Sequence, residues 1–303
     1  MNFISEIKKI NDILPGQILF NEKLSKYSWF NLGGPAKVIF KPKSLNELSL
    51  FLKKIEGFKK IKIIGAGSNT LIRDGGFDGV IIKLGKSFSH LSLFDQNTII
   101  SGASALDKKV SNFALENSIS GLEFLSCIPG TIGGGIIMNS GCYGGDVSKI
   151  LVSVQVMGMD GKIRIINHSD INFYYRGSSL NKDLIIISTT LKGKKDNKLN
   201  IEKKINTFIK KKATDQPSKI KTCGSTFKNA GDNKAWKLIK ESGCDDMKIG
   251  GAYISSKHCN FFVNEKNAKS NDIENLINQV KKKVFDKTGI SLELEIQIIG
   301  EKK

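Results

Sequence analysis

Arginine is scarce in this chain. Of its 303 residues, 47 are Lys or Arg, yet only Arg73, Arg164 and Arg176 are arginines. Specific phosphate and base recognition draws on arginine, because its planar guanidinium can donate two parallel hydrogen bonds. The formal charge of +18 therefore favours solvated lysine surfaces over a nucleic-acid-binding face. Where lysine is the usual cation, a retained arginine indicates a position that a lysine would fill poorly.

The chain also lacks the patterns of membrane, secreted and metal-binding proteins. No stretch reaches 18 apolar residues, and Met1 to Asp12 has neither an apolar core nor a small-residue cleavage site. The five cysteines include no C-x-x-C pair, which argues against a zinc ribbon or a redox dithiol. An odd number of cysteines suits a reducing compartment. We therefore expect a cytoplasmic protein without a bound metal.

Apolar spacing predicts an α+β fold, because short strands and helices follow one another without a regular strand–helix alternation. Ser44 followed by Glu47 is typical of a capped helix, here extending to Lys54. Asp160-Gly161 between two apolar runs predicts a hairpin. Further helices are expected over 106–117, 234–242 and 273–287.

Changes in composition divide the chain into three predicted domains. Short strands and glycine-rich turns become frequent after residue 85, and the polar stretch 192–200 is a candidate linker. Residues 292–299 alternate as a final strand. The predicted domains are 1–85, 86–196 and 197–303.

A first glycine-rich loop, Gly65-Ala66-Gly67-Ser68-Asn69, follows a predicted strand. Successive N–H groups of such a turn can hold a phosphate. Thr70 replaces the third glycine of a dinucleotide-binding turn, and no acidic residue stands about 20 residues further on, which disfavours a Rossmann loop. Gly85-Lys86-Ser87 lacks the spacing of a Walker A loop. A plain turn remains the alternative.

A second glycine-rich loop begins at Ile128, with seven glycines between 130 and 145. Ordering so many glycines costs conformational entropy, so a large bound group is expected to fix the loop. An extended loop without a ligand is the alternative. Two separate glycine-rich loops without a Walker lysine indicate a dinucleotide held between two lobes.

Three further polar features bear on the chemistry. Arg176 can bind a carboxylate or an enolate through two parallel hydrogen bonds, or form a surface ion pair. No histidine is spaced to pair with Ser225 as in a hydrolytic triad, which leaves that hydroxyl a proton-donor or a structural role. Glu293 and Glu295 share one face of the last predicted strand, where they face solvent or complete a polar site.

The order of these motifs resembles a known family. The motifs are GAGSNTLIRDGGFDG at 65–79, IPGTIGGGIIMNSGCYG at 128–144, YYRGS at 174–178, GSTFKN at 224–229, HCNFFVN at 258–264 and LELEIQIIG at 292–300. Together they are similar to the UDP-N-acetylenolpyruvoylglucosamine reductases over nearly the whole chain. The short third domain resembles the type II subgroup of that family.

The resemblance implies a two-lobed FAD-binding domain of the vanillyl-alcohol-oxidase (PCMH) type, plus a C-terminal α+β substrate-binding domain. By position, Ser225 matches the proton donor, while Arg176 and Glu295 match the pair that polarises the substrate carboxylate. Non-covalent FAD contacts are implied at Gly65, Ala66, Gly67, Ser68, Asn69, Pro129, Gly130, Thr131, Gly133 and Gly134. Substrate contacts are expected at Tyr175, Lys228 and Asn229.

The implied reaction has two halves. NADPH first reduces FAD and leaves, after which the enolpyruvyl group of the UDP-sugar accepts hydride and a proton to give UDP-N-acetylmuramate. This step belongs to peptidoglycan precursor synthesis, and so to cell-wall growth, cell shape and division. A monomer without nucleic-acid or membrane partners is implied. Asn31, Ala230 and Gln297 depart from residues common in the family.

Two alternatives come from other classes. A flavin-dependent oxidase of the same superfamily would not need Ser225, Arg176 and Glu295 together, and the oxygen reactivity of its reduced flavin would distinguish it. A basic nucleic-acid-binding protein is the second alternative, but the chain has no aromatic RNA-stacking motif.

Overall fold

A computed structural model describes residues 3–11, 13–14, 16–58 and 60–303, which form two compact units. Unit 1 comprises Met1–Phe20, Val38–Ala66 and Val80–Lys210, and unit 2 comprises Asn21–Lys37, Gly67–Gly79 and Lys211–Lys303. Met1, Asn2 and Asp12, at the N-terminal end, lie outside the described residues. The domain boundaries expected after residues 85 and 196 stay predictions.

The first sheet has the strand order β1-β2-β5-β3. Its strands are β1 (Gln17–Lys23), β2 (Pro35–Lys41), β3 (Ile61–Ile63) and β5 (Phe77–Ile82). Helices α1 (Phe3–Asn11) and α2 (Leu45–Lys54) contribute to its core, where the rings of Phe40 and Phe51 stack with centroids 3.9 Å apart. The predicted cap of α2 is confirmed, because Ser44 Oγ accepts a hydrogen bond from Glu47 N at 3.2 Å.

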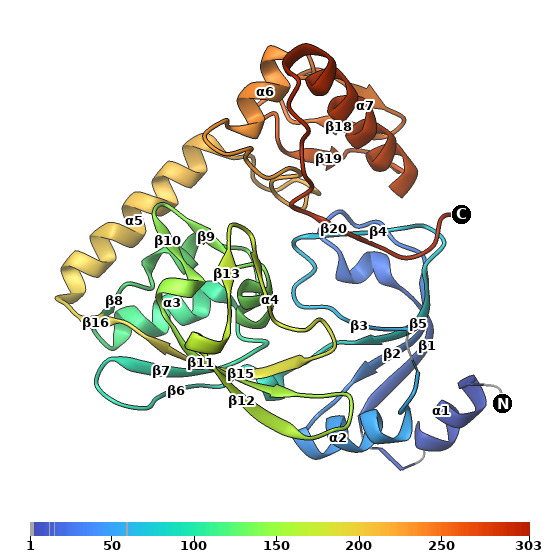
Figure 1. The fold of residues 1–303 in the computed structure, drawn as a ribbon, viewed down its shortest axis with the longest axis vertical. Coiled ribbons are helices and arrows are strands. Elements are labelled where there is room, and N and C mark those ends of the chain that lie inside the picture. The colour runs from blue at the N-terminus through green and yellow to red at the C-terminus, as the bar shows by residue number, and fades with distance from the viewer. Residues whose placement is uncertain (1–2, 12, 15, 59) are drawn as a thin grey trace. The chain divides into compact units, whose positions relative to one another are not determined.

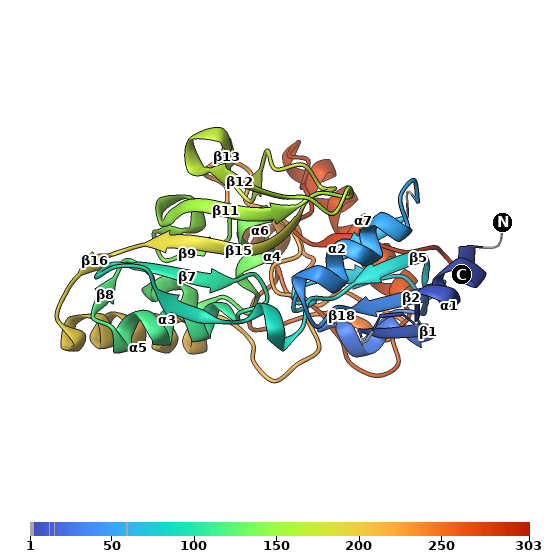
Figure 2. The ribbon, with the colours of Figure 1, turned by 90° about the horizontal axis from the view of Figure 1, so that it is seen from below.

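A five-stranded antiparallel sheet, in the order β12-β11-β15-β7-β6, forms the centre of unit 1 (Figure 1). Its strands are β6 (Leu91–Leu93), β7 (Thr98–Gly102), β11 (Leu151–Met157), β12 (Ile163–Asn167) and β15 (Ile185–Lys192). Helices α3 (Asp107–Glu116) and α4 (Ile132–Ile137) share its core, and α3 lies along one face of the sheet in Figure 2. The β11–β12 pair is the hairpin predicted at Asp160-Gly161.

Short strand pairs complete unit 1. They are β8 (Ile119–Ser120) with β16 (Lys194–Lys195), β9 (Gly141–Cys142) with β10 (Gly145–Asp146), and β13 (Phe173–Tyr174) with β14 (Gly177–Ser178). The expected linker over 192–200 is wrong, because β16 and the start of helix α5 (Lys198–Asp215) occupy it. The sequence had not predicted α5, which buries Ile201 and Ile205 one turn apart.

Unit 2 combines a small sheet with two helices. Strands β17 (Lys248–Ile249), β18 (Ala252–Ile254) and β19 (Phe262–Asn264) pair in that order, and helices α6 (Ala235–Glu241) and α7 (Ser270–Thr288) share their core (Figure 1). The buried residues of α7 form one apolar face: Ile273, Leu276, Ile277, Val280 and Val284. Short 3₁₀ segments in the two units are Leu24–Tyr27, Lys86–Phe88, Glu123–Cys127, Val147–Lys149 and His168–Asp170.

The final strand is shorter than expected. Only β20 (Gln297–Ile299) forms a strand, and it pairs in parallel with β4 (Thr70–Ile72). The residues before β20 follow an irregular course, with one isolated bridge between Leu294 and Phe227. The apolar alternation over 292–299 therefore predicted too long a strand. A strand requires a continuous hydrogen-bonded partner as well as alternating apolar residues.

Arg73 of unit 2 makes a two-pronged ion pair, which should stabilise this unit. Its Nε and Nη2 donate to the Glu274 carboxylate at 2.8 and 2.9 Å, and a lysine cannot form this pair of bonds. We expect Arg73→Lys to lower the free energy of unfolding in urea by about 1–3 kcal/mol. Arg164→Lys is the matched control, because the pair of Arg164 with Asp160 is largely exposed and should contribute little. Equal losses in both variants would contradict this role.

Candidate functional site

The predicted site residues fall into two groups, one in each unit. Unit 1 holds Gly65, Ala66, Pro129, Gly130, Thr131, Gly133, Gly134, Tyr175 and Arg176. Unit 2 holds Gly67, Ser68, Asn69, Ser225, Lys228, Asn229 and Glu295. The first glycine-rich loop therefore passes from one unit to the other between Ala66 and Gly67.

The two glycine-rich loops meet within unit 1. A Cβ atom on Gly65 would lie only 2.6 Å from Thr131 Oγ1, so a larger residue at 65 would require the Thr131 side chain to shift. The carbonyl oxygen of Gly65 also accepts a hydrogen bond from Lys83 Nζ at 2.6 Å. Burial and the nearby Lys41 lower the pKa of Lys83. Two loops that are more than 60 residues apart in sequence therefore lie next to each other in unit 1.

In the second loop, part of the backbone is hydrogen-bonded within the fold and part is exposed. The N–H groups of Ile132 and Gly133 donate to the carbonyl oxygens of Ala105 and Ala103 at 3.0 and 2.9 Å, so the fold itself uses these two amides. Gly134, in contrast, is exposed, and a Cβ there would meet only Thr131 Oγ1, at 3.6 Å. An open glycine backbone beside a hydroxyl suits close approach of a large planar and phosphorylated group. The surroundings of Gly134 thus have room for a group such as FAD.

Arg176 lies at the tip of the β13–β14 hairpin. Tyr174 pairs with Gly177, so Tyr175 and Arg176 form the turn, and Arg176 adopts a φ of +58°. A left-handed conformation is costly for a residue with a side chain and is often found at functional positions. The guanidinium donates from Nη2 to Gly141 O at 2.9 Å, and its carbon lies 5.0 Å from the centroid of the Tyr175 ring.

Ser225 and Glu295 lie on neighbouring segments of unit 2. Residues 225–227, called here the Ser225 segment, bridge to Phe261 on one side, through Ser225, and to Leu294 on the other, through Phe227. The N–H of Glu295 donates to the Thr226 carbonyl oxygen at 2.9 Å. Both Ser225 and Glu295 are half-buried. The structure thus brings the predicted proton donor and the predicted carboxylate together within one unit.

The other predicted residues of unit 2 have structural contacts. Lys228 Nζ lies 3.4 Å from the exposed carboxylate of Glu293, and Asn229 Oδ1 accepts a hydrogen bond from Ala235 N at the start of α6. Asn69 Nδ2 donates to the carbonyl oxygen of Glu295 at 2.9 Å. Asn69 therefore supports the backbone that carries a predicted catalytic residue, a contact that the sequence did not suggest.

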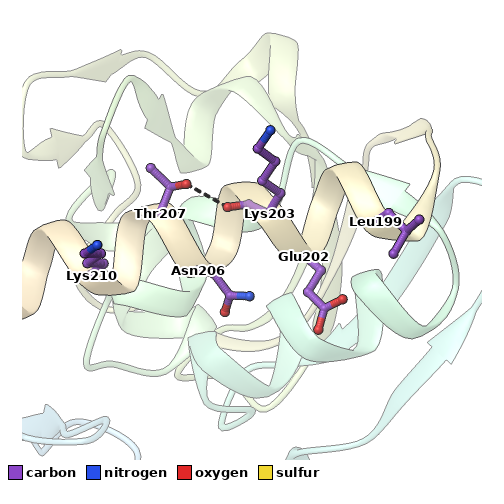
Figure 3. A pocket seen from close by; sticks show the side chains of 6 residues that line it. All are labelled: Leu199, Glu202, Lys203, Asn206, Thr207 and Lys210. Carbon is purple, nitrogen blue, oxygen red and sulfur yellow. Dashed lines mark hydrogen bonds between the residues drawn. The ribbon is translucent and has the colours of Figure 1, made fainter.

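A surface hollow of about 390 Å³ lies beside α5, and Figure 3 shows its lining side chains. These are Leu199, Glu202, Lys203, Asn206, Thr207 and Lys210, none of which belongs to the predicted site. One helix supplies the whole lining, so we assign no chemistry to it. Among the described residues, no helix is long and apolar enough to span a bilayer, and no three His, Cys, Asp or Glu side chains group as metal ligands.

Asp107 is a buried acid that sequence reasoning missed. It begins α3, is fully buried, and neither of its carboxyl oxygens has a hydrogen-bond partner. Its Oδ2 would lie 2.6 Å from a Cβ on Gly130, so the carboxyl group packs against the backbone of the second glycine-rich loop. Burial raises the pKa of Asp107 well above its ordinary value. A sequence signal was absent, because one acidic residue in a helix's first turn is usually solvated.

Comparison with known families agrees with this geometry. A family model described as "FAD binding domain" matches residues 36–167, a range that includes both glycine-rich loops. The fold and the meeting of the two loops therefore define an FAD-dependent oxidoreductase. A second model, described as "UDP-N-acetylenolpyruvoylglucosamine reductase, C-terminal domain", matches residues 216–299, which hold the Ser225 segment and Glu295.

Similarity to individual proteins extends over the full length. A reductase of this name from Pelagibacter ubique is 51% identical over 98% of this chain and 99% of its own. One from Orientia tsutsugamushi is 44% identical over 100% of this chain and 99% of its own. The crystal structure of the Thermus caldophilus reductase matches with a TM-score of 0.80 and 28% identity, over 94% of this chain and 99% of its own. The chain belongs to the UDP-N-acetylenolpyruvoylglucosamine reductase family, which confirms the resemblance seen in its motifs.

The buried carboxyl of Asp107 should make stability depend on pH. Unfolded Asp107 releases its proton near pH 4, about the ordinary value, whereas the folded state keeps the proton to higher pH. The folded state therefore binds more protons above about pH 4, and stability falls as pH rises from there to the raised folded pKa. Asp107→Asn keeps the shape but does not titrate. We expect the melting temperature of Asp107→Asn to rise relative to the parent's as pH increases above about 4, and a difference that does not change with pH would contradict this.

Proposed function

We propose that this chain reduces the enolpyruvyl group of UDP-N-acetylenolpyruvoylglucosamine to UDP-N-acetylmuramate, with NADPH as hydride donor and non-covalently bound FAD. The observation that carries the proposal is the placement of Ser225 and Glu295 on bonded segments of unit 2, in a chain of this family. The proposed setting is peptidoglycan precursor synthesis by a cytoplasmic monomer. Its proposed parts are two FAD-binding subdomains, 1–85 and 86–196, and a substrate-binding domain, 197–303.

The glycine-rich loops supply the proposed FAD site. Bound FAD supplies hydride-transfer chemistry, and the protein supplies binding, orientation and electrostatics. Gly134 offers exposed main chain for this group, next to the Thr131 hydroxyl, and Lys83 holds the carbonyl oxygen of Gly65 by a hydrogen bond. The pairing of Gly65 with Thr131 supports one continuous site from both loops.

Arg176 is the proposed ligand of the substrate carboxylate. Negative charge accumulates on this carboxylate and the neighbouring carbon once the methylene carbon has accepted hydride. A guanidinium can donate two bonds to the carboxylate, and preorganised donors of this kind contribute strongly to catalysis. The hydrogen bond to Gly141 O and the Tyr175 ring support a fixed orientation of the Arg176 side chain.

Ser225 is the proposed proton donor. Its hydroxyl would transfer a proton to the carbon next to the carboxylate, which completes the addition of hydride and proton across the double bond. Glu295 would polarise the same carboxylate from the adjacent segment. The half-buried position of both side chains supports a site that is shielded yet reachable by a small molecule.

Arg176→Lys tests the carboxylate role. We expect the variant to keep its flavin and to be reduced by NADPH at the parent rate, because the FAD loops are unchanged. Reoxidation by the enolpyruvyl substrate should lose roughly 2–4 kcal/mol of transition-state stabilisation, the cost of removing one oxyanion donor. Stopped-flow absorbance separates the two half-reactions, with Arg164→Lys as the control. A parent rate of reoxidation in Arg176→Lys would refute the role.

Ser225→Ala tests the proton donor. The variant should fold, bind FAD and be reduced by NADPH normally, while reoxidation by substrate slows by about 10²-fold or more, the scale of general acid catalysis. Ser225→Cys should recover part of the rate, because a thiol can also donate a proton. If Ser225→Ala turns over substrate normally, the hydroxyl is structural. If it loses FAD instead, Ser225 belongs to the cofactor site.

A further inference from the structure

The motif HCNFFVN, at 258–264, contains two buried asparagines whose roles the proposed mechanism leaves unassigned. Asn260 and Asn264 are each 4% exposed. Buried side-chain amides are retained where they satisfy polar groups that no regular strand reaches. Each of the two makes hydrogen bonds to backbone, but to different segments of unit 2.

Asn260 binds the Ser225 segment by three hydrogen bonds. Thr226 N donates to the main-chain oxygen of Asn260 at 2.8 Å, and Phe227 N donates to its Oδ1 at 2.9 Å. In return, Asn260 Nδ2 donates to Phe227 O at 2.8 Å. The side chain thus acts as a strand partner for Phe227, since it satisfies both the N–H and the C=O of that residue.

Only an amide can make this pair of side-chain bonds. A carboxylate has no donor, and a hydroxyl is too short to reach both backbone groups of Phe227 at once. The Phe227 ring is 1% exposed and packs edge-on against Phe262, so the segment is anchored by its apolar side as well. With Phe227 fixed by its ring and by Asn260, the backbone two residues earlier, at Ser225, has little freedom.

We propose that Asn260 is a positioning residue that holds the Ser225 hydroxyl in place for proton transfer. The inference rests on the proposed function of Ser225. On its other edge the same segment bonds to Glu295 N, so Asn260 also fixes the distance between the proposed proton donor and the proposed carboxylate. Small displacements matter at this step, because proton transfer requires the donor to lie within hydrogen-bond reach of the carbon's developing charge.

Asn264 provides a matched control within the same motif. Its Nδ2 donates to Phe30 O at 2.7 Å, and its Oδ1 accepts from Ala268 N at 3.2 Å. It has the same residue type, burial and number of side-chain bonds as Asn260, but its side chain does not bond to the Ser225 segment. Asn260→Ala and Asn264→Ala therefore remove equal interactions at different places.

The test compares the two half-reactions in both variants. We expect both to lose similar stability, to bind FAD and to be reduced by NADPH at the parent rate. Reoxidation by the enolpyruvyl substrate at saturation should fall about 10²-fold in Asn260→Ala, the scale of a misplaced reacting group, and stay at the parent rate in Asn264→Ala. Hydrogen exchange should accelerate at the amides of Thr226 and Phe227 in Asn260→Ala alone.

A double-mutant cycle shows whether Asn260 acts through Ser225. In a Ser225→Ala background, Asn260→Ala should cost far less than in the parent, because the group it positions is gone. If the two losses multiply, or if Asn260→Ala reoxidises at the parent rate, the proposal is overturned. A normal rate in Ser225→Ala alone overturns the proposed function and this inference together. Should Asn260→Ala fail to fold, Asn260→Ser, which keeps one polar contact, is measured against Asn264→Ser.

Discussion

Hydrogen bonds from asparagine side chains to backbone hold the short segments on which the site depends. Buried N–H and C=O groups require partners, and segments outside regular strands must obtain them from side chains. Asn69 donates to the carbonyl oxygen of Glu295, and Asn139 donates to Tyr174 O, in the hairpin that carries Arg176, at 3.2 Å. The Asn260 side chain makes two hydrogen bonds to the backbone of Phe227, in the Ser225 segment. An asparagine side chain therefore bonds to the backbone of each proposed catalytic residue or of a residue two positions away.

The contacts of the three arginines explain why this lysine-rich chain has arginine at these positions. Arg73 and Arg164 each place two nitrogens on a single carboxylate, and Arg176 combines a backbone hydrogen bond with contact to an aromatic ring. A lysine ammonium is a point donor and cannot place two parallel hydrogen bonds on one carboxylate. The scarcity of arginine indicated that these three positions have a specific role. It did not show what they bind: Arg73, close to a glycine-rich loop in sequence, pairs with Glu274.

Local signals predicted the parts of the fold that depend on neighbours in sequence. The cap at Ser44, the apolar face of α7 and the turn at Asp160-Gly161 all arise within a few residues, and each was confirmed. Helix α5 was not predicted, because its many lysines leave only a narrow apolar stripe in the sequence. This stripe is formed by Ile201, Ile205 and the partly buried Phe208.

Long-range contacts could not be read in this way. The close approach of the two glycine-rich loops, the partner of β20 and the three hydrogen bonds of Asn260 join residues that no local pattern connects. In the site, motif order alone indicated the family, while the bonds that support Ser225 and Glu295 needed coordinates. The burial of Asp107 was also not predicted, because burial depends on what packs over a helix rather than on the helix itself.

The parallel pairing of β4 with β20 has a consequence for the nascent chain. Asn69, just before β4, bonds to Glu295, which lies 226 residues later in the sequence. A ribosome adds about 5–20 residues each second, so β4 is synthesised roughly 10–45 s before β20. During that interval unit 2 lacks one edge of its backbone pairing, and Leu71, which is fully buried in the finished fold, lacks its surroundings. Unit 2 is thus completed only after β20 has been translated.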